Sequence, residues 1–404
     1  MNSASSSTFL SQRARLTPSS PIRKLSSLAD RAKMSGIKVH HLNIGQPDLR
    51  SPSFFLDALR SYNPSVLAYE TSQGSSRLRK AWASYIQRTL GLSLNPEHFL
   101  ITMGASEALI FVFMLCADPE DEILVFDPTY ANYIGFAAIS GVKLQPVPCD
   151  LENGFALPDR AQIVARIKSK TRAILLSNPN NPTGTVYSSE DLKLLLDLCD
   201  EFNLFLIVDE AYREFVYDGL KPLSVFHLAS NNPRVIVIDS LSKRFSLCGA
   251  RIGALITVNE LVMTAAVSLA SARLAAPSAE QFAATVLFEQ IHSDYVEESR
   301  SIYDKRRLLL FSLLSDVPDI EFVRPQGAFY SLVRLPVQSG EEFARFLLSD
   351  FSYRGATTFL APAEGFFLEN ERGAQMVRIA YILNEEDIRS AVEILMVALA
   401  KFKN

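Results

Sequence analysis

The stretch from Ser240 to Gly253 reads Ser-Leu-Ser-Lys-Arg-Phe-Ser-Leu-Cys-Gly-Ala-Arg-Ile-Gly. It directly follows the apolar run Val235 to Ile238, which predicts a buried strand. Within a dozen positions it places two hydroxyl groups, an amine and a guanidinium: Ser240, Ser242, Lys243 and Arg251. A buried strand that ends in so many polar groups indicates a functional site.

The middle of the chain alternates apolar runs, which predict strands, with amphipathic helices. The predicted strands are Phe99 to Thr102, Ile123 to Phe126, Val142 to Val147, Ala173 to Ser177, Leu204 to Val208 and Val235 to Ile238. Ser188 and Asp191 have the spacing of a capping box and predict the start of a helix. The alternation predicts an α/β fold with a mainly parallel sheet covered by helices on both faces. In open α/β sheets ligands bind at the carboxyl ends of the strands.

The C-terminal part predicts a second, smaller α+β domain. From Ser278 to Leu314 the pattern is helical, and a closing helix is capped at Asn384. The strands predicted between them are Ile320 to Val323, Gly327 to Val333 and Met376 to Ile382. We therefore divide the chain into an N-terminal segment packing with the small domain (1–45), a large domain (46–295) and a small domain (296–404).

Composition limits the classes of partner. A net charge of -4 without long runs of one sign argues against binding to nucleic acid or an anionic membrane, so small molecules and a second copy are the expected partners. No apolar run is long enough to span a bilayer. Four scattered cysteines predict a reducing, cytoplasmic compartment and no metal site. The serine-rich, acid-free start resembles a transit peptide, but its prolines favour a flexible start that leads into a docked segment.

Polar motifs follow several predicted strands. Gly45-Gln-Pro-Asp follows a short strand, Val39 to Ile44. Asn178-Pro-Asn-Asn-Pro-Thr-Gly184 and Asp209-Glu-Ala-Tyr212 follow two strands of the sheet, and Lys243 lies after a third. Another strand is followed by Gly104-Ala-Ser-Glu107 at the start of an apolar helix, where free N–H groups and a hydroxyl favour an anion.

Together these motifs resemble the aspartate aminotransferase family, the class I/II aminotransferases of pyridoxal-phosphate fold type I. The resemblance extends from about residue 20 to the C-terminus. It implies a seven-stranded, mainly parallel sheet in the large domain. It also implies pyridoxal 5'-phosphate as the cofactor, bound as a Schiff base to Lys243, and a homodimer with shared active sites.

The resemblance assigns the cofactor contacts residue by residue. Asp209 would hold the ring nitrogen protonated, which keeps the ring an electron sink. Tyr212 and Asn181 would hydrogen-bond the phenolic oxygen, and Tyr130 would stack on the ring, where many aspartate enzymes have tryptophan. The phosphate would be held by Ala105, Ser106, Ser240, Ser242, Arg251 and, from the neighbouring subunit, Tyr69. Glu210 is interpreted as structural and Arg244 as a solvent or interface residue.

The expected reaction is transfer of an amino group from an L-amino acid to 2-oxoglutarate, with Lys243, Tyr212 and Asp209 as catalytic residues. Arg378 would fork onto the substrate's α-carboxylate, with Gly45 and Asn181 nearby. Arg273 roughly matches the arginine that binds a distal carboxylate across the dimer, although its spacing to the next proline is short; Arg23 and Lys24 are alternatives.

The sequence leaves the substrate open. Aspartate is the expected amino donor, and the alternatives are an aromatic aminotransferase or a carbon–sulfur lyase of the same fold. A non-catalytic ligand-binding domain is disfavoured because no helix-turn-helix pattern precedes Gly45. A nicotinamide enzyme is disfavoured because no Gly-x-Gly-x-x-Gly follows the first strand.

Overall fold

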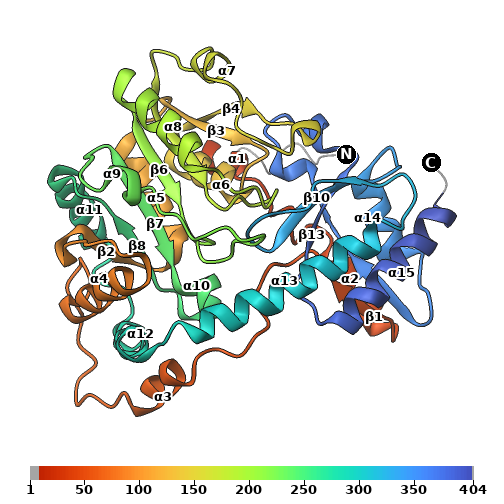
Figure 1. The fold of residues 1–404 in the computed structure, drawn as a ribbon, viewed down its shortest axis with the longest axis horizontal. Helices are drawn as coiled ribbons and strands as arrows, with labels where there is room; N and C mark the ends of the chain where they lie inside the picture. Colours follow the sequence, from red (N-terminus) through yellow and green to blue (C-terminus); the bar gives the residue numbers. More distant parts are fainter. Residues whose placement is uncertain (1–8, 403–404) are drawn as a thin grey trace.

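A computed structural model describes residues 9–402, and its largest sheet has seven strands (Figure 1). Across the sheet the strand order is β2-β8-β7-β6-β5-β3-β4, and β8 runs antiparallel to both of its neighbours. The other pairings, from β7 to β4, are all parallel. The strands are β2 (Phe99–Thr102), β3 (Glu122–Asp127), β4 (Lys143–Pro148), β5 (Thr171–Ser177), β6 (Phe205–Asp209), β7 (Val235–Ser240) and β8 (Gly253–Ile256).

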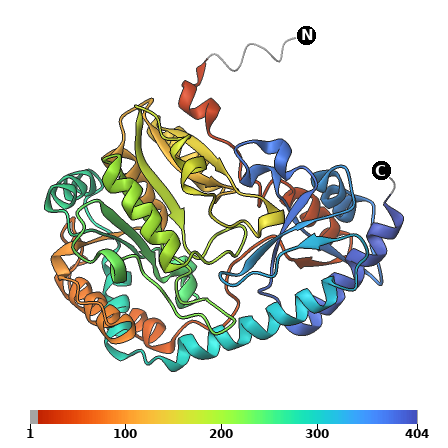
Figure 2. The same cartoon turned by 45° about the horizontal axis from the view of Figure 1, so that its top comes forward.

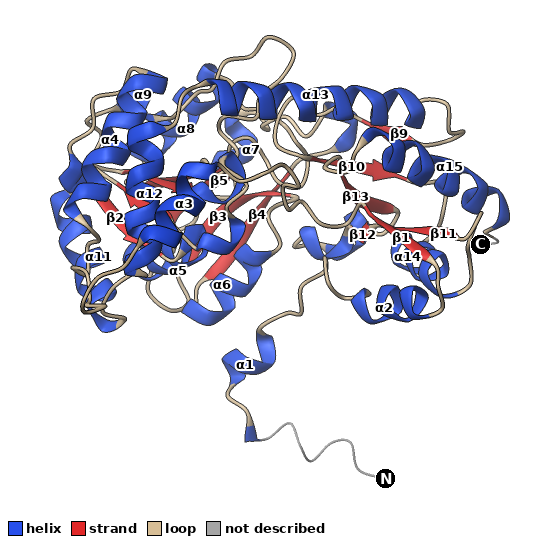
Figure 3. Cartoon of the chain, turned by 90° about the horizontal axis from the view of Figure 1, so that it is seen from below, coloured by secondary structure: helices blue, strands red, loops and turns tan. Residues whose placement is uncertain are grey.

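The central strands of this sheet are apolar on both faces because helices cover both. Along β3, Leu124 and Phe126 pack into one core, whereas Ile123 and Val125 pack into another on the opposite face. The first core is closed by helices α3 (Ser53–Ser61), α4 (Ser76–Leu90), α7 (Arg160–Val164), α8 (Ser189–Glu201), α9 (Phe226–Ala229) and α12 (Ser278–Gln290). The second is closed by α5 (Gly104–Cys116), α6 (Asn132–Ser140) and α11 (Glu260–Ala272) (Figure 3). None of the helices within residues 9–402 combines the length and apolar character needed to cross a membrane.

A second group of elements is built around two small sheets. One has the order β12-β13-β10-β9, and in the other β1 pairs in parallel with β11. The long helix α13 runs along one side of the molecule from the large sheet to this group (Figure 2). The strands are β1 (Lys38–His41), β9 (Glu321–Phe322), β10 (Tyr330–Arg334), β11 (Ala356–Phe359), β12 (Ala361–Pro362) and β13 (Met376–Ala380). The helices are α13 (Asp294–Leu314), α14 (Gly340–Ser349) and α15 (Glu385–Lys401).

The N-terminal part of the chain shares the core of this second group. Leu25 and Leu28, at the start of α2 (Ser26–Met34), and Val39 on β1 pack with residues of α13, α14 and α15. A short helix, α1 (Gln12–Leu16), precedes them. The division of the chain at residues 45 and 295 stays a prediction.

The α/β prediction with a mainly parallel sheet is confirmed, and most strands lie where the apolar runs placed them. Ser188 and Asn384 cap α8 and α15 as predicted, each accepting a hydrogen bond from the backbone N–H three residues on. The prediction missed three short strands: β8 and β11, each four residues long, and β12, which has two residues. The predicted helical stretch from Ser278 to Leu314 is confirmed and consists of two helices, α12 and α13.

Candidate active site

A cavity of about 690 Å³ lies at the carboxyl ends of β5, β6 and β7. All the predicted site residues line it except Tyr69 and Arg273. They come from both parts of the fold: Gly45 and Arg378 come from the second group of elements, and the rest from loops and helices around the large sheet. The cavity therefore collects the motifs that follow the strands, where ligands of α/β sheets bind.

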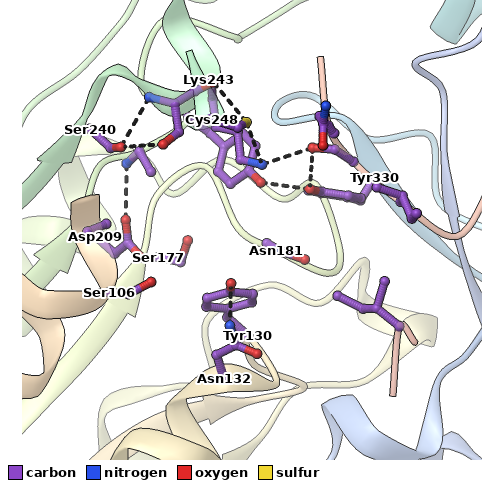
Figure 4. Close-up of a pocket in the computed structure, with 18 of the residues that line it drawn as sticks. Ser106, Tyr130, Asn132, Ser177, Asn181, Asp209, Ser240, Lys243, Cys248 and Tyr330 are labelled. Carbon is purple, nitrogen blue, oxygen red and sulfur yellow. Dashed lines mark hydrogen bonds between the residues drawn. The ribbon is translucent and has the colours of Figure 1, made fainter. Parts of the chain in front are cut away.

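Lys243 lies on the one-turn helix α10 (Leu241–Arg244) directly after β7. Ser240 caps this turn, because its Oγ accepts a hydrogen bond from the backbone N–H of Ser242 at 3.1 Å. The Lys243 Nζ donates to the carbonyl oxygen of Gly45 at 2.9 Å and lies 4.0 Å from the Cys248 Sγ (Figure 4). The amine is thus held inside the cavity by contacts with neutral groups.

Asp209 ends β6 and is buried beside the cavity. Its carboxylate accepts hydrogen bonds from the Tyr133 hydroxyl at 2.9 Å and from the Ala211 N–H at 3.1 Å. Burial raises the pKa of Asp209 to about 6, and the two hydrogen bonds oppose this rise. Above that pH the cavity contains a fixed negative charge, which can stabilise a proton on a heteroaromatic nitrogen.

One end of the cavity is suited to a phosphate group. Ala105 and Ser106 present the N-terminus of the thirteen-residue helix α5, where backbone N–H groups lack helical partners. The Arg251 guanidinium lies beside this terminus and donates to the carbonyl oxygens of Met103 at 3.2 Å and Cys248 at 3.1 Å. The hydroxyls of Ser240 and Ser242 line the same cavity. Free N–H groups, hydroxyls and a guanidinium are the donors that a phosphate needs.

Arg378 lies on β13 and is buried. Its guanidinium donates to the Asn181 side chain at 3.0 Å and to the Asn43 carbonyl at 2.7 Å, and its Nε has no partner within residues 9–402. Burial lowers the pKa of Arg378, and its hydrogen-bond partners among the described residues are neutral groups. A buried cation that faces a cavity without an anion favours an anionic ligand such as a carboxylate.

Two tyrosines from the large sheet point their rings at the cavity. The Tyr212 hydroxyl lies 2.7 Å from the Tyr330 hydroxyl, and the Tyr130 hydroxyl accepts a hydrogen bond from Asn132 at 2.8 Å (Figure 4). Burial raises the pKa of Tyr212 and that of Tyr130. Both phenols therefore keep their protons over the physiological pH range.

Two predicted site residues lie away from the cavity. The Tyr69 side chain is 80% exposed, as a residue that reaches into a neighbouring subunit would be. Arg273 pairs with Glu107 at 3.1 Å and donates to the Ile101 carbonyl at 2.8 Å. Its charge is therefore largely neutralised within its own chain.

The sequence interpretation of Arg244 is wrong. The residue is 1% exposed and forms ion pairs with Asp239 at 2.6 Å and Glu214 at 2.8 Å. Arg213 joins the same buried cluster through Glu210, Glu214 and Asp239. Glu210, interpreted as structural, is buried in this cluster. Arg244 is the last residue of α10, the turn that carries Lys243, so the cluster anchors this turn to the large sheet through Asp239 on β7.

Sequence reasoning also missed two tyrosines. Tyr133 binds Asp209, and Tyr330 lines the cavity on the side of Arg378. Both tyrosines are buried, and a buried phenol normally needs a hydrogen-bond partner. A tyrosine within an apolar segment could therefore have indicated a polar partner nearby.

The residues fit pyridoxal phosphate, the cofactor that the resemblance implies. The cavity combines an amine on Lys243, a buried carboxylate on Asp209 and the donor set for a phosphate. Arg378 lines the same cavity, and a guanidinium there suits a substrate carboxylate. Each of the three functional groups of the cofactor (aldehyde, ring nitrogen and phosphate) thus has a chemically matched residue.

Comparison with known proteins agrees with this fit. The sequence profile of the family "Aminotransferase class I and II" matches residues 37–395. An aspartate aminotransferase of Pyrococcus horikoshii is 28% identical over 393 residues, which is 95% of each chain. An aromatic-amino-acid aminotransferase of Thermococcus litoralis is 29% identical over 391 residues, covering 95% of this chain and 96% of the relative. The structure of the aspartate aminotransferase from Thermus thermophilus with maleate superimposes with a TM-score of 0.87 at 28% identity, covering 96% of this chain and 99% of the other.

Proposed function

The chain belongs to the class I and II aminotransferases, enzymes that depend on pyridoxal phosphate, and we propose that it transfers the amino group of L-aspartate to 2-oxoglutarate. The observation that carries this proposal is the cavity that is lined by the Lys243 amine, the Asp209 carboxylate and the Arg378 guanidinium, whose partners among the described residues are neutral. The products would be oxaloacetate and glutamate.

Bound pyridoxal phosphate supplies an electron sink for the pair that is released when the substrate's α-C–H bond breaks. Lys243, whose Nζ already lies inside the cavity, takes the proton from the α-carbon and holds it until it returns to carbon. Asp209 would keep its negative charge against the ring nitrogen. Tyr212 and Asn181 would donate hydrogen bonds to the phenolic oxygen, and Tyr130 would stack on the ring.

Arg378 is the residue that we expect to orient the substrate. Asn181 and the Asn43 carbonyl hold two of its nitrogens at 3.0 and 2.7 Å, and the rings of Tyr330 and Phe366 lie 4.2 and 4.7 Å from the guanidinium carbon. This packing leaves the guanidinium little freedom to turn. Arg378 would bind the α-carboxylate and so point the α-hydrogen toward Lys243.

For the second carboxylate of aspartate we favour Arg23 over Arg273. Arg23 lines the cavity, whereas Arg273 is paired with Glu107. The segment around Arg23 is fixed on both sides, because the Ile22 carbonyl accepts from the Asn43 amide at 2.9 Å and Lys24 pairs with Glu341 at 2.5 Å. The Asn43 carbonyl also accepts a hydrogen bond from Arg378, so Asn43 contacts both Arg378 and the segment that carries Arg23.

The assay is steady-state transamination with 2-oxoglutarate and either aspartate or phenylalanine. We expect Arg23→Ala to lower kcat/KM for aspartate about 10- to 100-fold, the loss of one charge-assisted contact, and to leave phenylalanine unchanged. Lys24→Ala is the matched control, because its charge is already paired with Glu341. A loss of aspartate turnover in Arg273→Ala alone would restore Arg273 as the distal cation.

An aromatic aminotransferase is the second candidate. It is favoured by the phenol of Tyr130 and by the relative from Thermococcus litoralis. A higher kcat/KM for phenylalanine than for aspartate in the wild type would select it. Release of pyruvate and ammonia from cysteine without an oxo acid would instead indicate a carbon–sulfur lyase and would contradict the aminotransferase proposal.

We propose that the active unit is a homodimer in which Tyr69 reaches the phosphate of the other subunit's cofactor. The exposed side chains of Val66, Leu67 and Tyr69 form an apolar strip that a second copy would cover. The four free cysteines support a cytoplasmic location. Sedimentation of the purified protein tests the dimer, and an active monomer would exclude it.

A further inference from the structure

Tyr330 joins three parts of the cavity that are far apart in the sequence. It lies on β10, which pairs with the strand β13 that carries Arg378. Its hydroxyl oxygen lies 3.2 Å from the Gly45 carbonyl oxygen and 2.7 Å from the Tyr212 hydroxyl oxygen (Figure 4).

The number of protons fixes the direction of these hydrogen bonds. A phenol carries a single proton. In the proposed function Tyr212 donates its proton to the cofactor, so the short contact of 2.7 Å requires Tyr330 to donate to the Tyr212 oxygen rather than to the more distant Gly45 carbonyl at 3.2 Å. The Gly45 carbonyl accepts from the Lys243 Nζ at 2.9 Å. The Tyr330 hydroxyl thus lies between the Tyr212 phenol and the carbonyl that holds the Lys243 amine.

The Tyr330 side chain has no room to move. The Arg378 guanidinium carbon lies 4.2 Å from the centre of its ring, and the Tyr212 ring packs edge-on at 5.6 Å. A Cβ atom at position 45 would lie 1.9 Å from the Tyr330 hydroxyl oxygen, so this arrangement requires glycine there. Tyr330 is therefore held between the arginine, the second tyrosine and the Gly45 backbone.

We propose that Tyr330 is a positioning residue that acts through Tyr212: it orients the Tyr212 hydroxyl relative to Lys243 and Arg378. This inference rests on the proposed function, in which Tyr212 hydrogen-bonds the cofactor. Removing the Tyr330 oxygen leaves the buried Tyr212 phenol without its hydrogen-bond donor but keeps the ring beneath Arg378. The change should therefore affect the chemical step more than substrate binding.

The experiment compares Tyr330→Phe, Tyr212→Phe and the double variant, each loaded with pyridoxal phosphate. Without substrate, the pH midpoint of the bound cofactor's absorbance is measured. We expect Tyr330→Phe to shift the midpoint in the same direction as Tyr212→Phe but by less, and the double variant to match Tyr212→Phe. With substrate, we expect kcat of Tyr330→Phe to fall about tenfold while KM stays within about twofold.

A control separates this role from a purely structural one. Tyr217 is also buried, and its hydroxyl donates to the Ala328 carbonyl at 2.9 Å, so Tyr217→Phe removes a comparable hydrogen bond without changing the Tyr212 hydroxyl's partner. We expect Tyr217→Phe to leave the midpoint unchanged. An unchanged midpoint in Tyr330→Phe, or shifts that add in the double variant, would overturn the proposal. Failure of the wild type to transaminate any amino acid would instead refute the proposed function, because the midpoints are measured without substrate.

Discussion

Replacing Arg244 with methionine removes the buried cation that follows Lys243 on the same turn, α10. In the structure the guanidinium is buried, with Asp239 at 2.6 Å and Glu214 at 2.8 Å. Methionine fills a similar elongated space without charge. The variant would therefore leave two buried carboxylates with fewer positive partners.

The loss in the free energy of unfolding depends on the contacts that the two carboxylates keep in the variant. Removing one partner of a buried ion pair costs about 3–5 kcal/mol. Asp239 keeps hydrogen bonds from Arg213 and from the Trp82 indole, so we expect the lower end, about 3 kcal/mol. For 404 residues that unfold together, the entropy of unfolding is about 0.8 kcal/mol per kelvin, so Tm should fall by about 4 °C.

Calorimetry of the cofactor-loaded protein measures this shift, with Arg60→Met as the matched control. Arg60 pairs with Asp57 at the same 2.6 Å, but the two side chains are 72% and 65% exposed. Exposed pairs contribute about 1 kcal/mol or less, so the control should melt within about 1 °C of the wild type. Equal Tm values for Arg244→Met and the wild type, or equal losses in the two variants, would refute the role of burial in this cluster.

Two further predictions concern the cofactor site. In the folded protein Asp209 has a pKa of about 6, so between pH 4 and 6 it binds more protons than it does in the unfolded chain. The stability of the cofactor-free protein therefore falls as pH rises through that range. Cofactor-free Asp209→Asn should therefore have a Tm about 3 °C above that of the cofactor-free wild type at pH 8. This difference in Tm should shrink toward pH 5, and a difference that grows on acidification would contradict the prediction. A Cβ on Gly253 would lie 2.5 Å from the Gly104 carbonyl carbon and so displace the start of α5. Gly253→Ala should raise the Kd for pyridoxal phosphate about tenfold in fluorescence titrations, whereas Gly135→Ala should not, because Gly135 has open space on α6 and does not line the cavity; equal affinities would refute the phosphate site.

Local patterns predicted much of the fold because the central strands are buried on both faces and so form continuous apolar runs. Caps such as Ser188 and Asn384 depend only on residues within one turn, and both were predictable. The strand β8 was missed because its four residues directly follow the polar stretch that ends at Gly253. Short pairing strands depend on neighbours that the local sequence does not reveal.

The site was predictable where a motif carries the chemistry and unpredictable where distant residues complete it. Lys243 and Asp209 follow apolar strands, and the topology brings those strand ends together. Arg244 resembles any charged residue beside a lysine, and its burial depends on Glu214, which is thirty positions away. Tyr330 finds its partners 118 and 285 residues away, at Tyr212 and Gly45.

The central claim is that Lys243 is the residue to which pyridoxal phosphate is attached. Reduction of the cofactor-loaded protein with borohydride, followed by peptide mass spectrometry, locates the attachment directly. We expect one pyridoxyl phosphate group on the peptide that contains Lys243, together with loss of turnover, and no such group in Lys243→Ala. Attachment to any other lysine, or normal steady-state transamination by Lys243→Ala, would contradict the account.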